Sequence, residues 1–188
     1  MPLPFFIMDV VIIGKGHGWE NAPTDGETWG VNNLCLRRPV KMAFNMHDLD
    51  KHREHYLFNK TIEYVNANAL PIVTQKKYAH IPTSIPFPID EMPRKYFTNS
   101  IDYMVAYAIY KGASRIDTYG VVMEAGTEYA MQRPSLEYWI GRAEGAGIPV
   151  EIHKPSGVCF HPNGLYGYEW DEELMDHVRF RRENLPNG

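Results

Sequence analysis

A glycine-rich turn follows the first apolar run of the chain. Residues 14–18 have the sequence GKGHG and come directly after DVVII. Glycine permits positive φ and close approach of the backbone, so this turn could present N–H groups to an anion, with Lys15 or His17 adding a donor. The spacing is GxGxG and the next residue is the bulky Trp19, which fits neither the dinucleotide-binding GxGxxG pattern nor a Walker A loop. An anion-binding turn and a plain tight turn are both open.

Two further polar positions could face a ligand. The segment WGVNN ends in Asn32 and Asn33, whose amides can hydrogen-bond a ribose or a base edge, although asparagine is also common in turns. Asn99 or Ser100 can cap a helix that the following apolar spacing predicts. A helix N-terminus binds phosphate through free N–H groups, so Ser100 has either a ligand-binding role or a capping role alone.

Carboxylates follow two other apolar runs. His47 and Asp48 come after VKMAFNM, and a carboxylate such as Asp48 could hold Mg²⁺ on a polyphosphate. Glu124 and Glu128 come after RIDTYGVVM, and either could act as a general base or a metal ligand. Alternatively, all of these side chains could be solvent-exposed loop residues without a functional role.

The composition indicates one soluble globular domain. Of the 188 residues, 44% are hydrophobic and 22% are charged, values typical of such domains. The net charge of −4 gives no basic field that would favour nucleic acid. The apolar start, residues 1–14, is too short to span a bilayer and lacks the basic region of a signal peptide. We therefore expect no membrane partner, and residues 1–6 could pack against a second copy of the chain.

The chain has two cysteines, Cys35 and Cys159, far apart and without CxxC spacing. This argues against a disulfide framework and against structural zinc. We expect a reducing compartment, the cytoplasm, and any metal to be a weakly held divalent ion such as Mg²⁺ near Asp48 or Glu124.

The apolar pattern predicts strands that alternate with helices. Unbroken β-branched residues, as in residues 8–14, are typical of a strand buried on both faces. Helical spacing from Ile101 predicts an amphipathic helix, Asp48 or Asp50 could cap an earlier helix, and four prolines predict an irregular loop over 78–93. We expect strands at 8–14, 28–32, 40–46, 70–75, 115–123 and 148–153, and helices at 49–66, 101–111, 134–145 and 171–183.

This order predicts an α/β fold, a Rossmann-like, doubly wound and mostly parallel sheet. We expect DVVIIG and RIDTYGVV to be adjacent central strands, because their apolar character needs cover on both faces. We expect a single domain over residues 1–188, with a C-terminal loop and helix at 154–188. Ligands of such sheets bind beyond the carboxyl ends of the strands, which is where the polar side chains described above should lie.

The order of segments over residues 10–156 resembles a known family. A strand with a glycine turn, WGVNN, MAFNMHD and NSIDYMVAYAIYKGASRIDTYGVVM follow one another. This order is similar to the Rossmann-like domain of Campylobacter-type sialyltransferases and of archaeal 6-hydroxymethylpterin diphosphokinase-like (MptE-like) proteins. The YGYE segment at 166–169 also resembles uncharacterised phage proteins.

The resemblance implies a nucleotide site. In the sialyltransferases the glycine turn, an Asn after the second strand and a Thr-Ser pair at the cap of the central helix contact the nucleotide. The corresponding residues here are Gly14 and Gly16, Asn32, and Asn99 with Ser100.

Two departures concern the catalytic groups. The stretch GTEYAMQRPS lacks the general-base histidine of the sialyltransferases, and residues 120–122 have the sequence GVV where Gly-x-Asp is usual. Glu124 and Glu128 are the nearest carboxylates. We therefore expect a nucleotide- or nucleotide-sugar-binding transferase, with glycosyl and diphosphate transfer both open. The alternative is a non-catalytic nucleotide-binding protein, encoded by a phage.

Overall fold

The computed structural model describes residues 8–52, 54–123, 126–159 and 165. Residues Met1–Val158 form one compact unit, and Cys159–Gly188 form a second. The predicted helix at 171–183, the YGYE segment, residues 1–6 and Glu124 lie outside the described residues. The single domain expected over 1–188 stays a prediction.

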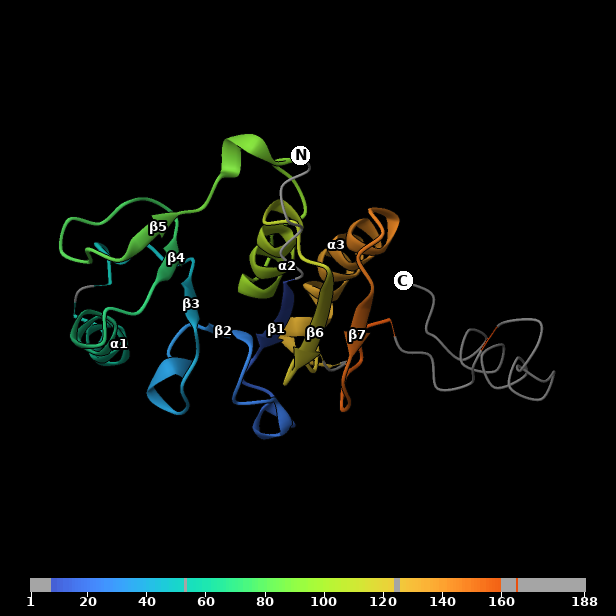
Figure 1. Ribbon diagram of the computed structural model, residues 1–188, viewed down its shortest axis with the longest axis horizontal. Helices are drawn as coiled ribbons and strands as arrows, with labels where there is room; N and C mark the ends of the chain where they lie inside the picture. Colours follow the sequence, from blue (N-terminus) through green and yellow to red (C-terminus); the bar gives the residue numbers. More distant parts are fainter. Residues whose placement is uncertain (1–7, 53, 124–125, 160–164, 166–188) are drawn as a thin grey trace, which may run out of the picture. The chain divides into compact units, whose positions relative to one another are not determined.

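Seven strands form one sheet in the order β5-β4-β3-β2-β1-β6-β7, and every pair is parallel (Figure 1). The central strand β1 pairs with β2 on one side and with β6 on the other, where Ile12 lies opposite Thr118. The predicted parallel fold and the predicted adjacency of DVVIIG and RIDTYGVV are therefore confirmed. The strands are β1 Asp9–Ile13, β2 Glu27–Val31, β3 Met42–Asn45, β4 Ile72–Thr74, β5 Ser84–Pro86, β6 Arg115–Tyr119 and β7 Val150–Ile152.

Strand β1 is central because both of its faces are apolar. Val10 and Ile12 are fully buried in the main core beneath the helices on one face. Val11 and Ile13 pack on the other face, against Leu34. A strand that is apolar on both faces is suited to the interior of a sheet that is covered on both sides. The turn after Ile13 therefore lies between the ends of β2 and β6.

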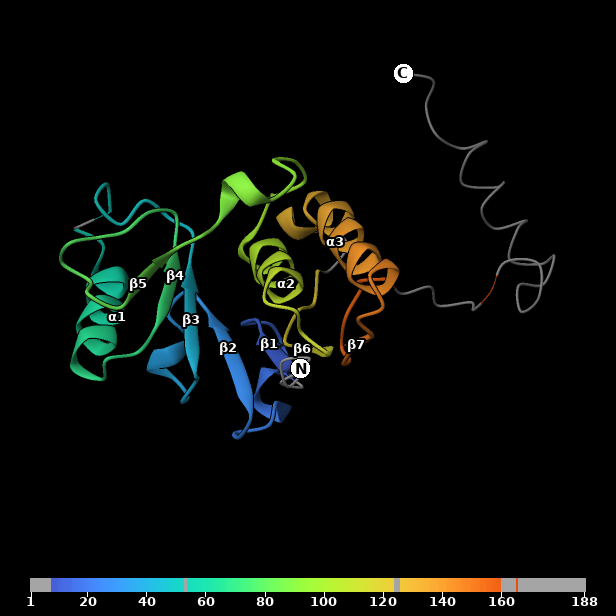
Figure 2. The same cartoon turned by 45° about the horizontal axis from the view of Figure 1, so that its top comes forward.

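Helices cover both faces of the sheet, as a doubly wound fold requires. Helices α2 (Ser100–Tyr110) and α3 (Arg133–Gly145) lie side by side on one face (Figure 2). Helix α1 (Tyr56–Ala67) packs on the opposite face, where Val65 contacts the apolar side chains of β3 and β4. Four short 3₁₀ helices complete the described elements: η1 Trp19–Asn21, η2 Leu34–Leu36, η3 Ile89–Glu91 and η4 Glu128–Met131.

The prediction that a helix begins at residue 49, capped by Asp48 or Asp50, is wrong. Helix α1 begins at Tyr56, and His55 precedes it without a side-chain cap. The Asp48 carboxylate accepts a hydrogen bond from the backbone N–H of Asp50, two residues further along the chain, at 3.1 Å. An aspartate that satisfies the backbone in this local way favours a turn over a helix.

The prediction of an irregular loop over residues 78–93 missed two short elements. Strand β5 pairs with β4 at the edge of the sheet, with Thr74 opposite Pro86. An edge strand needs backbone donors on one side only, which is why it tolerates a proline. Because prolines are rare in strands, the sequence did not predict β5. The 3₁₀ helix η3 begins three residues after the end of this strand.

Candidate functional site

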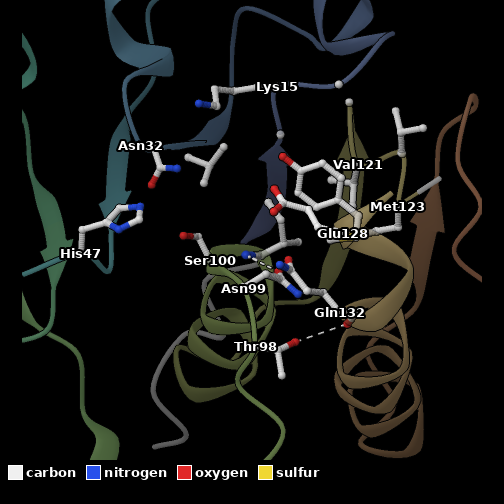
Figure 3. A pocket seen from close by; sticks show the side chains of 17 residues that line it. Lys15, Asn32, His47, Thr98, Asn99, Ser100, Val121, Met123, Glu128 and Gln132 are labelled. Atoms are coloured by element: carbon white, nitrogen blue, oxygen red, sulfur yellow. Dashed lines mark hydrogen bonds between the residues drawn. The ribbon is translucent and has the colours of Figure 1, made fainter. Parts of the chain in front are cut away.

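A pocket of about 520 Å³ opens at the carboxyl edge of the sheet. The chain runs from β1 to β2 on one side of the sheet and returns to β6 on the other, so this edge is the switch point at which α/β proteins bind ligands. Figure 3 shows side chains from the strand ends, α2 and η4 turned into one space. The lining residues are Gly14, Lys15, Gly16, Val31, Asn32, His47, Thr98, Asn99, Ser100, Ile101, Gly120, Val121, Val122, Met123, Glu128, Tyr129 and Gln132.

The glycine turn packs against the loop after β6. Gly14 donates its N–H to the Tyr119 carbonyl and Gly16 donates to the Gly120 carbonyl, each at 2.8 Å. A Cβ on Gly14 would overlap the Gly120 oxygen, and a Cβ on Gly16 would lie 2.5 Å from the Val122 side chain. Both N–H groups are paired within the protein, so for Gly14 and Gly16 the structure favours the tight-turn alternative over an anion-binding one. The glycines allow two backbone segments to touch.

The lysine of the turn remains at the pocket. Lys15 Nζ donates to Asn33 Oδ1 at 3.2 Å, and partial burial, followed by the charge of Arg37, lowers the pKa of the ammonium group. The Lys15 N–H makes no hydrogen bond to the residues that the structure describes. His17, which we also expected at the site, is not among the lining residues.

Helix α2 begins with a capping box built by Asn99, not by Ser100. Asn99 Oδ1 accepts from the N–H groups of Ile101 (2.8 Å) and Asp102 (3.1 Å), and the Asp102 carboxylate accepts from the N–H (3.2 Å) and Nδ2 (2.8 Å) of Asn99. The Asp102 carboxylate also accepts from Thr98 N–H at 2.8 Å. Asn99 is therefore committed to the helix.

Ser100 is the first residue of the helix and faces the pocket (Figure 3). Its N–H and hydroxyl make no hydrogen bond within the described part of the chain. Of the two cap candidates, Ser100 is thus the one whose polar groups can serve a ligand. Its N–H carries the partial positive charge of the helix N-terminus.

Asn32 lines the pocket in a strained backbone position. Its φ is 51°, in the left-handed region that asparagine tolerates better than most residues, and its N–H donates to the Phe44 carbonyl at 2.7 Å. The side-chain Oδ1 is buried and has no hydrogen-bond partner among the described residues. A buried carbonyl oxygen without a donor is costly, so this position fits a hydroxyl or amino group of a ligand.

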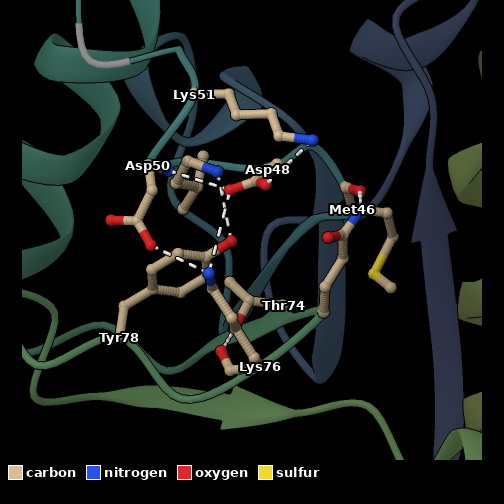
Figure 4. A network of polar contacts seen from close by, with 9 residues as sticks. Met46, Asp48, Asp50, Lys51, Thr74, Lys76 and Tyr78 are labelled. Atoms are coloured by element: carbon tan, nitrogen blue, oxygen red, sulfur yellow. Dashed lines mark hydrogen bonds and ion pairs between the residues drawn. The ribbon is translucent and has the colours of Figure 1, made fainter.

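The candidate acids are spread apart. Glu128, at the start of η4, points into the pocket, while Glu124 is not described (Figure 3). Asp48 lies outside the pocket, where its carboxylate is within 3.7 Å of Lys51 Nζ and 4.0 Å of Lys76 Nζ (Figure 4). In the described ranges no three His, Cys, Asp or Glu side chains are grouped to hold a metal ion. Asp48 as a Mg²⁺ ligand stays a prediction, and its lysine partners already balance its charge.

His47, the neighbour of Asp48, lines the pocket instead. Partial burial lowers the pKa of its imidazole, and His52, Lys15 and His55 lower it further. The sequence feature that indicated a place at the pocket is its position just after β3, at the same edge of the sheet as Asn32. Gln132, which the sequence places at the same edge after RIDTYGVV, also lines the pocket. Tyr129 and Thr98 line it too, and nothing in their spacing singled them out.

No protein-family model matches the chain, and no curated protein matches its sequence. None of the helices that the structure describes is long and apolar enough to cross a membrane. The architecture is that of Rossmann-like α/β proteins, and solved structures share it.

Structures of the sialyltransferase CstII are among them. The Campylobacter jejuni enzyme in complex with cytidine-5′-monophosphate (CMP) is 15% identical, with a TM-score of 0.51 over 94% of this chain and 100% of that one. The complex with the substrate analogue CMP-3FNeuAc is 16% identical, with a TM-score of 0.50 over 78% and 80% of the two chains. A singly substituted variant in complex with CMP is 14% identical, with a TM-score of 0.51 over 77% and 81%. The likeness shows a common fold, so the resemblance to sialyltransferases is confirmed at that level. The MptE-like and phage resemblances stay predictions.

Proposed function

We propose that the pocket binds a nucleotide or nucleotide sugar, and that the protein is a glycosyltransferase that uses it. The observation that carries the proposal is the buried, unpaired Oδ1 of Asn32, which shares the pocket with the free hydroxyl and N–H of Ser100. The location at the switch point supports it. So do the CMP and CMP-3FNeuAc complexes of CstII, which has the same fold.

The two residues suit different parts of a nucleotide. Ser100 can donate two hydrogen bonds to a phosphate at the positive end of α2. Asn32 Oδ1 is an acceptor, so it suits a ribose hydroxyl or the amino group of a base. Lys15 also lines the pocket, and its N–H, which has no hydrogen-bond partner among the described residues, is a further possible donor.

Glu128 is the carboxylate of the described residues that reaches the pocket. In the proposed reaction it removes the proton from an acceptor hydroxyl. The acceptor oxygen then bonds to the anomeric carbon, and the bond between that carbon and the phosphate oxygen breaks. The nucleotide leaves with the electron pair, and no metal is required to balance the step.

The test is release of CMP from a CMP-linked sugar, followed by chromatography with and without acceptor sugars. The proposal expects release in the wild type and at least about a hundredfold less in Glu128→Gln, the usual scale of a lost general base. The matched control is Glu20→Gln, an exposed glutamate on η1. A nucleotide that binds and stays intact with every acceptor would favour the rival, a non-catalytic binding protein.

A further inference from the structure

The end of the pocket nearest to β3 gathers basic side chains. Lys15 and His47 both line it there, beside Asn32 (Figure 3). His52 and His55 lie next to His47 on the segment that leads into α1. We call Lys15, His47, His52 and His55 the imidazole corner.

The three imidazoles of the corner are packed around one aromatic ring. The ring centroid of Phe58 lies 5.1 Å from that of His47, 5.4 Å from that of His52 and 4.5 Å from that of His55. The His47 and His52 rings are 6.1 Å apart. All three imidazoles are exposed, so solvent weakens the repulsion between them when they are protonated, and a bound anion would reduce it further.

The described part of the chain includes three carboxylates close to the corner in sequence, Asp48, Asp50 and Glu54. No carboxylate in it forms an ion pair with any member of the imidazole corner. Lys15 Nζ bonds to the neutral amide of Asn33. Asp48, the next residue after His47, is engaged by Lys51 and Lys76 (Figure 4).

The beginning of helix α1 adds to the same field. His55 is its N-cap residue and offers no side-chain cap, and the first turn contains no acidic residue. The Phe58 N–H donates to the His55 carbonyl at 3.0 Å, and the first N–H groups of a helix carry a partial positive charge. The corner thus combines a lysine, three imidazoles and a helix N-terminus.

The acid–base behaviour agrees with this geometry. Burial, followed by the charges of His52, Lys15 and His55, lowers the pKa of His47. Burial and Arg37 lower the pKa of Lys15. Burial and positive neighbours account for both shifts, and a bound anion would act in the opposite direction and raise both pKa values.

We propose that the imidazole corner is an oxyanion subsite that holds a carboxylate or phosphate group of the second substrate. The proposal rests on the proposed function, in which Asn32 and Ser100 take the nucleotide and leave the corner to the acceptor. Glu128 lies at the other end of the pocket (Figure 3), so the acceptor's anionic group would be held away from that carboxylate. The other charged residues beside the corner that the structure describes are the cations Lys51, Lys76 and Arg37 and the carboxylates Asp48, Asp50 and Glu54.

The experiment is a histidine NMR titration of the full-length protein. Inorganic phosphate is added at about pH 6, where imidazoles begin to protonate, to the protein saturated with CMP. We expect phosphate to raise the pKa of His47 and to leave that of His80, an exposed histidine outside the pocket, unchanged. A parallel titration with acetate shows whether the corner prefers a carboxylate or a phosphate group.

Two variants make the same chemical change in and outside the corner. His47→Gln should weaken phosphate binding about tenfold, the scale of one charge-assisted hydrogen bond, while His80→Gln should bind phosphate as the wild type does. Binding should also weaken as the pH rises, since only protonated imidazole attracts the anion.

Three results would decide against one or both proposals. No shift of the His47 signal with phosphate or acetate overturns the subsite. CMP alone raising the His47 pKa and excluding phosphate also overturns it, because the corner would then hold the donor's own phosphate. Phosphate acting on His47 in a protein that binds no CMP or other nucleotide would instead overturn the proposed function and leave an oxyanion subsite.

Discussion

At the scale of single residues, the glycines and Asn32 have different roles: the glycines allow two loops to pack together, and Asn32 lines the pocket. Gly14 and Gly16 remove the side chains that would keep the β1 and β6 loops apart, and their N–H groups join those loops. Asn32 keeps its amide in the pocket with an unpaired oxygen. The glycines therefore join the loops through the backbone, and the polar side chain of Asn32 lines the pocket beside them.

Gly14→Ala should lower the free energy of unfolding by about 1–3 kcal/mol, the usual cost of overpacking, since the new Cβ overlaps the Gly120 carbonyl oxygen. The control is Gly141→Ala on α3, where a Cβ meets no atom within 4 Å. It should raise stability by about 0.5–1 kcal/mol, the helix preference for alanine. Urea denaturation measures both, and an unchanged Gly14→Ala protein would show that the loops do not need this contact.

The sequence predicted which residues meet at the site better than what each one does there. Gly14, Lys15, Gly16, Asn32, Asn99, Ser100 and Glu128 do line the pocket, because the carboxyl ends of parallel strands share one edge. The pairing of the glycine N–H groups could not be predicted, since it depends on how closely β6 approaches. Asp48 and His47 are neighbours in sequence, and only the turn after β3 decides which of them faces the pocket.

At the scale of elements, the start of α2 combines residues that cap the helix with a residue, Ser100, that faces the pocket. Asn99 and Asp102 satisfy one another and the first backbone N–H groups. Ser100 keeps its donors free at the same helix end. Under the proposed function, Ser100 would offer its donors to an anion from a helix end that Asn99 and Asp102 already stabilise.

Asn99→Ala should lower the free energy of unfolding by about 1 kcal/mol, the usual loss for an N-cap. Ser100→Ala should change it by less than about 0.5 kcal/mol, as expected for a residue with no hydrogen bond to lose. CMP binding should follow the opposite order, with Ser100→Ala the weaker binder. Denaturation and calorimetry on the two variants test this, and a large stability loss in Ser100→Ala would contradict the assignment of the cap.

Asp102 gives the cap a pH dependence of known sign. Burial raises the pKa of its fully buried carboxyl group above the ordinary value of 3.8, although hydrogen bonds from Thr98 and Asn99 oppose this. The folded protein therefore binds this proton more readily than the unfolded chain. The contribution of this proton to stability is present below 3.8 and is lost as the pH rises through the folded-state pKa.

The free energy of unfolding of the wild type, minus that of Asp102→Asn, should therefore fall as the pH rises through this window. Urea titrations over a series of acid to neutral buffers measure the difference. Asp25→Asn, at an exposed position, is the control for a surface aspartate. A difference that grows with pH would mean that the hydrogen bonds outweigh burial.

Element boundaries were predictable where one local signal dominated. Helices α2 and α3 begin within one residue of their expected starts, because apolar spacing and a cap or a proline agree there. Helix α1 was placed too early, since the Asp48 turn competes with helix formation. Strand β5 is held by its pairing with β4 and not by its own sequence, so its prolines suggested a loop.

At the scale of the whole fold, the order of the strands places the recognition groups. Strand β1 lies between β2 and β6, so the loops after β1, β2, β3 and β6 border one pocket with the N-terminus of α2. This arrangement depends on the parallel sheet and not on any single residue. Because the parallel sheet does not depend on single residues, this chain can share its fold with the CstII sialyltransferase structures at only 14–16% sequence identity.

The most direct test of a nucleotide site at this pocket is calorimetric titration of CMP into the wild type and into Asn32→Asp. The substitution keeps the size and the left-handed backbone preference of asparagine, but it places a negative charge beside the nucleotide. We expect CMP to bind the wild type and to bind Asn32→Asp at least about tenfold more weakly, a loss of about 1.4 kcal/mol. Asn21→Asp, on η1 outside the pocket, should bind as the wild type does. Equal CMP affinity in the wild type and Asn32→Asp, or no binding of any nucleotide to the wild type, would contradict the account.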